Sequence, residues 1–138
     1  MTFPNTESTT QKKQGLVADR VDFVLRLRDK EISFCEVTGY SQKNDEAKDG
    51  VDLWRLVRFG NSVLHEGSLM VHLLQVVYDD AMLYRLFPYI RGVMVLAEDG
   101  AFTIPTHVRA IGALQASLPV LVWHKVVLNR NDRVLGKP

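Results

Sequence analysis

Residues 69–78 (LMVHLLQVVY) form an apolar run that is interrupted only by His72 and Gln75. The run is about half of the roughly 20 residues that a membrane-spanning helix needs, and its length suits a buried strand. Successive side chains of a strand point to opposite faces of the sheet, so a strand that is apolar on both faces must be covered on both. This segment therefore predicts a sheet that is covered by a helix or by a second subunit.

Further strands are predicted on both sides of this run. Apolar and polar residues alternate over residues 21–27, which indicates a half-buried strand that continues, after a bend, through residues 32–37. Residues 39–50 (GYSQKNDEAKDG) are polar and rich in turn formers, so they predict a loop. The remaining strands are expected at residues 51–59, at residues 62–65 after a turn at Gly60-Asn61, and at residues 120–128.

Two helices are predicted in the second half of the chain. Apolar residues recur at three- and four-residue spacing over residues 83–97, as in an amphipathic helix of about 18 residues. Pro88 would remove a hydrogen bond inside that helix, so the helix is expected to start near Pro88 or to bend there. Gly100 is expected to end it. An extended connection over residues 101–105 then leads to a shorter helix at residues 106–117, which Pro119 stops.

Length and composition indicate one domain without an unusual charge. The 138 residues include 46% hydrophobic and 24% charged residues, with a formal net charge of +1. We expect a disordered tail at residues 1–15, a single domain at residues 16–128 and a basic tail at residues 129–138. The polar N-terminus has no signal-peptide core, and the lone Cys35 excludes an internal disulfide, so a cytoplasmic protein is expected.

A search for catalytic motifs is negative, and no cofactor or metal is expected. Neither common glycine-rich phosphate loop is present, and the four histidines form no metal-binding pattern. A zinc site assembled from distant residues stays open as an alternative. The stretch from Asp22 to Glu36-Val37-Thr38 resembles a metal-dependent nuclease core. However, Thr38 replaces the lysine expected two residues after the glutamate, so a nuclease site is not expected, and the chain is predicted not to be an enzyme.

Two segments resemble the SecB family of export chaperones. Residues 23–34 (FVLRLRDKEISF) are similar to the first strand and turn of that family, and residues 86–91 (LFPYIR) are similar to its helix-opening motif. The Gly100-Ala101-Phe102 and Ile104-Pro105 steps follow in the same order as in SecB. The resemblance implies an α+β fold with an antiparallel sheet of about four strands and a long and a short C-terminal helix. It also implies a homotetramer or a dimer.

The function that this resemblance implies is binding of unfolded polypeptides, for secretion or for folding of a specific client. Four apolar residues are the candidate peptide-binding residues: Trp54, Phe59, Phe102 and Ile104. Three residues are the candidates for helix packing and oligomer contact: Leu86, Phe87 and Tyr89. The near-neutral charge departs from the acidic SecB proteins where they meet the motor SecA, so a chaperone linked to a phage or to a toxin–antitoxin system is expected rather than one that serves SecA. No binding of nucleic acid and no membrane insertion are expected.

A phage tail-tube-like structural subunit is the alternative. Residues 34–40 (FCEVTGY) resemble a short step of that family, and the chain length is comparable. An enzyme with a scattered active site is a further alternative.

Overall fold

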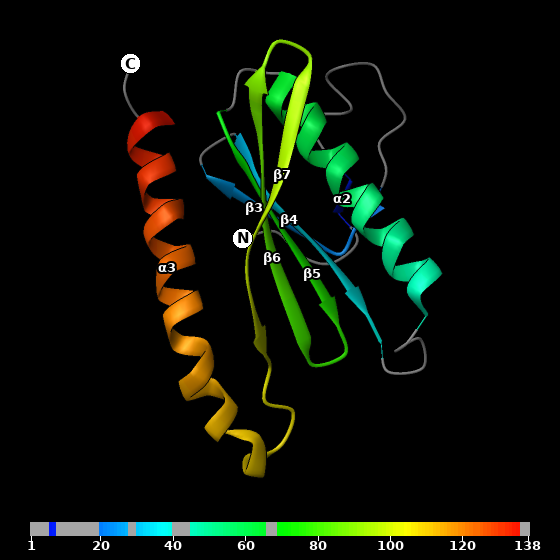
Figure 1. Cartoon of the computed structure of the whole chain (residues 1–138), viewed down its shortest axis with the longest axis vertical. Coiled ribbons are helices and arrows are strands. Elements are labelled where there is room, and N and C mark those ends of the chain that lie inside the picture. Colours follow the sequence, from blue (N-terminus) through cyan, green and yellow to red (C-terminus); the bar gives the residue numbers. More distant parts are fainter. Residues whose placement is uncertain (1–5, 8–19, 28–29, 40–44, 66–68, 136–138) are drawn as a thin grey trace.

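The computed structural model of this chain describes residues 6–7, 20–27, 30–39, 45–65 and 69–135. They form a five-stranded sheet with one long helix on each face (Figure 1). The strands are β3 (Phe23–Leu27), β4 (Lys30–Thr38), β5 (Val71–Val77), β6 (Asp80–Ile90) and β7 (Val93–Thr103), and they lie side by side in chain order. The strands β4 and β5 are parallel because the helix α2 (Glu46–His65) crosses between them, and all other pairs are antiparallel.

The α+β class is confirmed, but the finer prediction was wrong in two respects. The sheet is mixed and has five strands, instead of about four antiparallel ones. One helix lies in the middle of the chain, and the C-terminal helix is the longer of the two, with 24 residues against 20. A separate two-stranded ladder joins β1 (Thr6–Glu7) to β2 (Arg20–Val21), so two residues of the predicted tail at residues 1–15 are in a strand. The other residues of that tail lie outside the described residues.

The helix α2 replaces the strands predicted at residues 51–59 and 62–65 and the turn between them. Asp45 caps its first turn, since the Lys48 amide donates to the Asp45 carboxylate over 3.0 Å. Four residues at helical spacing point into the protein and are buried: Asp52, Leu56, Phe59 and Val63. The predicted loop is also shorter than expected, because residues 46–50 belong to the helix; residues 40–44 lie outside the described residues.

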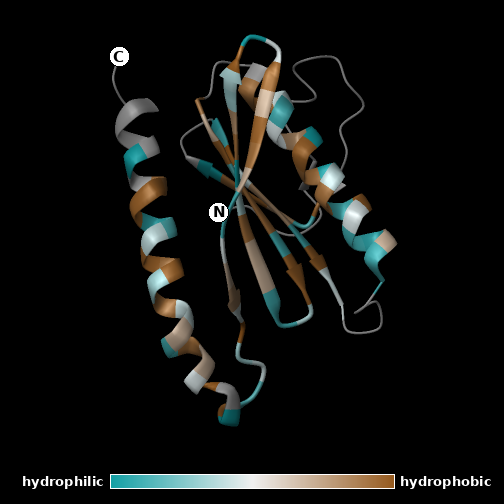
Figure 2. Ribbon diagram, in the orientation of Figure 1, coloured by the Kyte–Doolittle hydropathy of each residue, from teal (hydrophilic) through white to brown (hydrophobic). Residues whose placement is uncertain are grey.

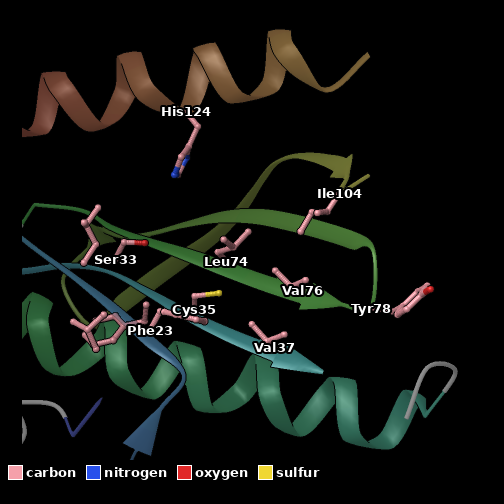
Figure 3. Close-up of a pocket in the computed structure, with 12 residues that line it drawn as sticks. Phe23, Ser33, Cys35, Val37, Leu74, Val76, Tyr78, Ile104 and His124 are labelled. Carbon is pink, nitrogen blue, oxygen red and sulfur yellow. The ribbon is translucent and has the colours of Figure 1, made fainter. Parts of the chain in front are cut away.

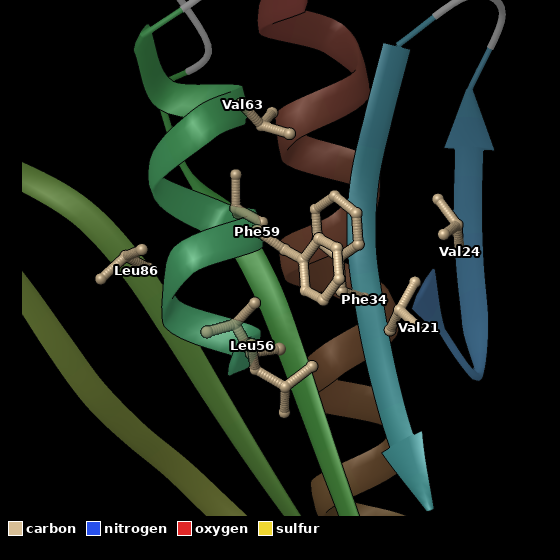
Figure 4. Packing of buried hydrophobic residues seen from close by; sticks show 9 residues of the cluster. Val21, Val24, Phe34, Leu56, Phe59, Val63 and Leu86 are labelled. Carbon is tan, nitrogen blue, oxygen red and sulfur yellow. The ribbon is translucent and has the colours of Figure 1, made fainter. Parts of the chain in front are cut away.

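The main core lies between α2 and the sheet (Figure 4). Phe59 of α2 stacks on Phe34 of β4 with ring centroids 5.2 Å apart. Gly60 lets the helix approach the sheet closely, because a Cβ atom there would lie 2.9 Å from a methyl group of Leu86. The strand predicted at residues 69–78 is confirmed as β5, and its two polar residues, His72 and Gln75, are buried.

The helix predicted at residues 83–97 was wrong, because these residues form the β6–β7 hairpin. Ile90 pairs with Val93 across a two-residue turn, and Gly92 adopts a φ of 79°, which glycine tolerates without a steric penalty. Pro88 lies within β6 and opposite Met94, so it neither opens nor bends a helix. The register shifts between Leu83 and Tyr84, where Asp99 is the extra residue of β7. The helix-like spacing arises because β6 has buried residues on both of its faces, such as Leu83 and Leu86.

The C-terminal helix α3 (Gly112–Leu135) follows a short 3-10 turn, η2 (Val108–Ala110). It corrects three predictions: Pro119 lies inside the helix and does not stop it, residues 120–128 are helical, and residues 129–135 continue the helix. Gly100 lies in β7, where it ends no helix. A Cβ atom on Gly100 would lie 3.0 Å from Val120, so this glycine lets α3 pack closely on β7. No helix of the described residues is long and apolar enough to cross a membrane.

Candidate active site

A group of charged side chains lies where the end of β4 meets the first turns of α2. We call Asp22, Glu36 and Asp52 the carboxylate cluster. Glu36 and Thr38 are two residues apart on β4, so both point to the face that α2 covers. Asp52 comes from the buried side of α2 and accepts a hydrogen bond from the Thr38 hydroxyl over 3.0 Å. The cluster therefore joins the sheet to the helix.

Lys48 brings a positive charge to the same place. Its ammonium group pairs with the Asp52 carboxylate, one helical turn further along α2. The same ammonium nitrogen lies 3.3 Å from the Thr38 hydroxyl oxygen, to which it donates. The position of Lys48 follows from the cap at Asp45 and from a second tie, a 2.8 Å hydrogen bond from the buried Gln75 amide to the Asp49 carbonyl. Helix α2 thus holds a lysine ammonium against β4.

Asp22 reaches the cluster from the bend before β3. Its carboxylate accepts a hydrogen bond of 2.7 Å from the Val37 amide, which fixes it beside β4 although 15 residues separate the two in sequence. Asp22 also lies close enough to the Glu36 carboxyl group to raise its pKa. The Asp22 and Glu36 carboxyl groups are therefore neighbours in this cluster.

Glu36 is the most perturbed member of the cluster. Only 5% of the residue is exposed, and burial raises the pKa of its carboxyl group to about 7, against the lowering effect of Arg55 and with further raising by Asp22 and Asp52. The Arg55 guanidinium lies 3.4 Å from Glu36 Oε1. This contact lacks hydrogen-bond geometry, and Oε1 has no hydrogen-bond partner among the described residues. A buried carboxylate oxygen without such a partner is costly unless a ligand or a cation reaches it.

The side chains of the carboxylate cluster can offer oxygen ligands to a metal ion, but no sulfur or imidazole nitrogen. Among the described residues, no group of three or more His, Cys, Asp or Glu side chains is arranged to hold a metal ion. Carboxylate oxygens nevertheless suit Mg²⁺, which keeps several water molecules and is commonly bound by only one or two carboxylates together with substrate phosphates. Asp22 and Glu36 could supply these two carboxylates.

Cys35 is not a nucleophile in this structure. Its side chain points to the opposite face of the sheet from Glu36. Burial, with smaller effects from Asp22 and Glu36, raises the pKa of its thiol to about 12, so the thiol stays protonated at neutral pH.

An apolar groove lies on that opposite face, between the sheet and α3 (Figure 3). It has a volume of about 520 Å³ and is lined mainly by apolar side chains of β3, β4 and β5. Phe23, Val37, Leu74 and Val76 form its floor, and Ile104, Tyr78 and His124 lie at its edges.

The structure does not bring the four predicted peptide-binding residues together. Phe59 is in the core under α2, whereas Ile104 lines the apolar groove on the other face. Trp54 is 65% exposed on α2, and Phe102 is partly buried on β7. Of the three residues predicted to pack helices, all lie in β6: Leu86 is in the core, Phe87 is partly buried and Tyr89 is exposed. Their peptide-binding and oligomer roles stay predictions.

Lys48 is the candidate site residue that the sequence analysis did not single out. The helical spacing of Asp52, Leu56, Phe59 and Val63 and the capping residue Asp45 would have indicated α2, and with it the turn that carries Lys48. Comparison of the chain with protein-family models, with curated proteins and with solved structures found no match in any of the three.

Proposed function

We propose that this protein is a metal-dependent phosphodiesterase of the nuclease type, with its active site at the carboxylate cluster and Lys48. The observation that carries the proposal is the position of the Lys48 ammonium, 3.3 Å from the Thr38 hydroxyl. The sequence has Thr38 where a nuclease core would place a lysine two residues after the glutamate. In the fold, helix α2 supplies a lysine ammonium at that position, so the reason for excluding a nuclease site no longer holds.

The charges of the site favour a bound cation. The carboxylate cluster has three carboxyl groups, and within the described part of the chain Lys48 and Arg55 form ion pairs with it. A divalent ion between Asp22 and Glu36 would offset the repulsion of these two groups and would give Glu36 Oε1 a partner. Such an ion, when bound, polarises a phosphoryl oxygen and lowers the pKa of a water molecule.

The side chains around this place suit hydrolysis of a phosphodiester. Hydrolysis adds water across a P–O bond: the water oxygen bonds to phosphorus, and the leaving oxygen takes a proton. Lys48 is placed to orient the attacking water and to offset negative charge on the phosphate, because its ammonium has three donors, of which Asp52 and Thr38 take two. Arg55 can bind a second phosphate oxygen through its planar fork.

The test is cleavage of a supercoiled plasmid and of a fluorescent single-stranded oligonucleotide by the full chain, with Mg²⁺ or Mn²⁺ and with EDTA. We expect cleavage that needs the metal ion and that falls at least about 100-fold in Glu36→Gln, Asp22→Asn and Lys48→Met, because each removes a ligand or a charge from the reacting groups. The matched controls are Asp80→Asn and Lys125→Met, which neutralise exposed side chains outside the site. Circular dichroism checks that each variant is folded.

Isothermal titration with Mn²⁺ separates binding from catalysis. Asp22→Asn and Glu36→Gln should lose the metal site, whereas Lys48→Met should keep it and lose only cleavage. If the wild-type chain binds no divalent ion, or if the Lys48 variant cleaves as fast as the wild type, the proposed function is wrong.

A SecB-type chaperone is the second candidate, and one observation favours it. The apolar groove includes Ile104, one of the predicted peptide-binding residues, and has the size and apolar lining of a ligand site. The motif at residues 86–91 gives it no support, because residues 86–90 lie in β6 and not at the start of a helix. Suppression of client aggregation that Ile104→Ser weakens would favour this candidate. The tail-tube alternative stays a prediction, and no feature of the described residues favours it.

A further inference from the structure

Helix α3 covers only part of its face of the sheet. Five strands at a spacing of about 4.8 Å span about 19 Å from the first to the last, whereas a helix with its side chains is about 10 Å wide. The helix lies over β7, where Val120 approaches Gly100 and the Ser117 hydroxyl lies 3.3 Å from the Thr103 carbonyl oxygen. His124 of α3 also reaches the buried His72 of β5, with ring centroids 5.0 Å apart. The part of this face formed by β3 and β4 is therefore not under α3.

The apolar groove lies over this uncovered part (Figure 3). Large apolar side chains on its floor and edges stay open to solvent, with Phe23 and Val37 each about 40% exposed. Soluble monomers rarely leave a continuous apolar patch of this kind, and such patches usually mark an interaction site. An apolar surface about as wide as one helix would be needed to cover the groove.

The outward side of α3 is apolar as well. Leu114, Leu118, Val122 and Val126 follow one another at four-residue spacing, so they form one row along the helix, which we call the α3 stripe. Each is at least about two-fifths exposed, and Val122 reaches 59%. Figure 2 shows hydrophobic segments along α3, mixed with hydrophilic ones. No Asp, Glu, Lys or Arg stands between Arg109 and Lys125.

We propose that the occupant of this face is a second copy of the chain, in a two-fold dimer with the two α3 helices packed between the two sheets. Each α3 stripe would pack against the partner's α3, and each helix would cover the groove of the other copy. A two-fold interface places the same surface on both sides, so it must be complementary to itself. The segment of α3 before Lys125 carries no charge and meets this demand, because no like charges of that segment face each other across the axis.

The size of the interface requires both the stripe and the groove. A 24-residue helix is about 36 Å long, so a band about 10 Å wide along it gives about 360 Å² on each copy. Two such bands give about 700 Å², which is below the roughly 1,200 Å² of a stable interface. The floor of the groove has to supply the rest, and this excludes a dimer that is held by the two helices alone.

A membrane surface fits α3 less well than a second copy does. Helices that lie on membranes carry lysine and arginine along their polar face. The middle of α3 has no such residue, and its basic side chains begin only at Lys125. The observations therefore favour a protein partner with an apolar face.

The test is the mass of the full chain in solution, measured by light scattering after gel filtration and by sedimentation equilibrium. We expect twice the chain mass of 15.7 kDa. The double variant Leu118→Glu/Val122→Glu should be a folded monomer with a dissociation constant at least about 100-fold higher, because it buries four unpaired charges per dimer. The matched control is Val108→Glu, which adds a charge at an apolar residue that is 82% exposed on η2 and outside the stripe.

A second measurement keeps the test independent of any loss of folding. Val122→Cys in a Cys35→Ala background should form a covalent dimer under mild oxidation, whereas Val108→Cys in the same background should not. A wild-type chain that is monomeric at micromolar concentrations overturns the proposal, and so does a dimer that survives the double glutamate variant. Binding of the monomer to anionic lipid vesicles, or to an unfolded client through the groove, would also overturn it by naming another occupant.

Discussion

The substitution Leu56→Ala distinguishes between the helix α2 and the strand that the sequence predicted at residues 51–59. In the strand, Leu56 would share a face with Trp54 and Arg58, away from Phe59. In α2, Leu56 and Phe59 lie on the same side, and neither has any exposed surface. The two arrangements therefore predict different losses of stability for Leu56→Ala.

The expected loss of stability can be worked from the burial of the side chain. A Leu→Ala change in a core costs about 2–5 kcal/mol, depending on how far the surroundings collapse. Leu56 is completely buried between α2 and the sheet, so we expect about 3–4 kcal/mol. A chain of 138 residues has a total stability of roughly 7–20 kcal/mol, so the variant should still fold. Trp54→Ala on the same helix should cost less than about 0.5 kcal/mol, because that side chain is mostly exposed.

Urea unfolding followed by far-ultraviolet circular dichroism measures both variants without relying on tryptophan fluorescence. The midpoint should fall for Leu56→Ala, with an unchanged slope, and should stay the same for Trp54→Ala. A loss below about 1 kcal/mol for Leu56→Ala, or a larger loss for Trp54→Ala, would refute the packing of α2 on the sheet.

Three further outcomes follow from the packing. Gly60→Leu should lower the free energy of unfolding by about 1–3 kcal/mol in urea titrations, although leucine favours helices, because a core methyl group of β6 would lie 2.9 Å from the new Cβ. Pro119→Ala should raise the melting temperature, since it restores an amide donor inside α3, with a gain of about 1–3 kcal/mol. Burial, with His124 and Arg85, lowers the pKa of His72 to about 3, so the folded protein keeps this ring neutral. Stability should be full above about pH 6.5 and fall by roughly 3 kcal/mol on titration to pH 4, and His72→Leu should remove that part of the pH dependence.

The strands were predictable where their periodicity was undisturbed. Residues 69–78 had an apolar pattern that only a doubly covered strand explains, and β5 lies in the middle of the sheet under α2. The alternation over residues 21–27 likewise became β3, although β3 pairs antiparallel with β4 and does not continue into it as one bent strand. In both cases the side-chain pattern repeats every two residues, as a strand demands.

The second half of the chain could not be read in this way, for two physical reasons. The strand β6 is buried on both faces, since Leu86 belongs to the core under α2 whereas Ala81 and Leu83 point to the other face, and the combined spacing of these residues resembles that of a helix. The helix α3 has apolar residues on its stripe as well as on the side facing β7, so it lacks the polar face that identifies a surface helix. Residues 120–128 therefore looked like a strand.

Only part of the candidate site could be found in the sequence. The stretch from Asp22 to Glu36 was noted as resembling a nuclease core, but the nuclease site was rejected because Thr38 stands where a lysine is expected. Lys48 was not connected to them because its contact with Thr38 depends on the crossover of α2, a tertiary feature that local spacing does not encode. A motif that requires a charge at one strand position can be completed by any element that packs over that position.

The two faces of the sheet separate the two proposals physically. The carboxylate cluster is on the face that α2 covers, and side chains at odd positions of β4, such as Cys35 and Val37, are on the face with the groove. A substitution in the α3 stripe therefore reaches the cluster only through the sheet itself, whose β4 and β5 strands are joined by a continuous parallel ladder. Metal binding and dimer formation are thus expected to be nearly additive, because the sites share no side-chain partner. If the stripe variant lost the metal site, the sheet would have to depend on the second copy for its structure, and the dimer would then be obligate.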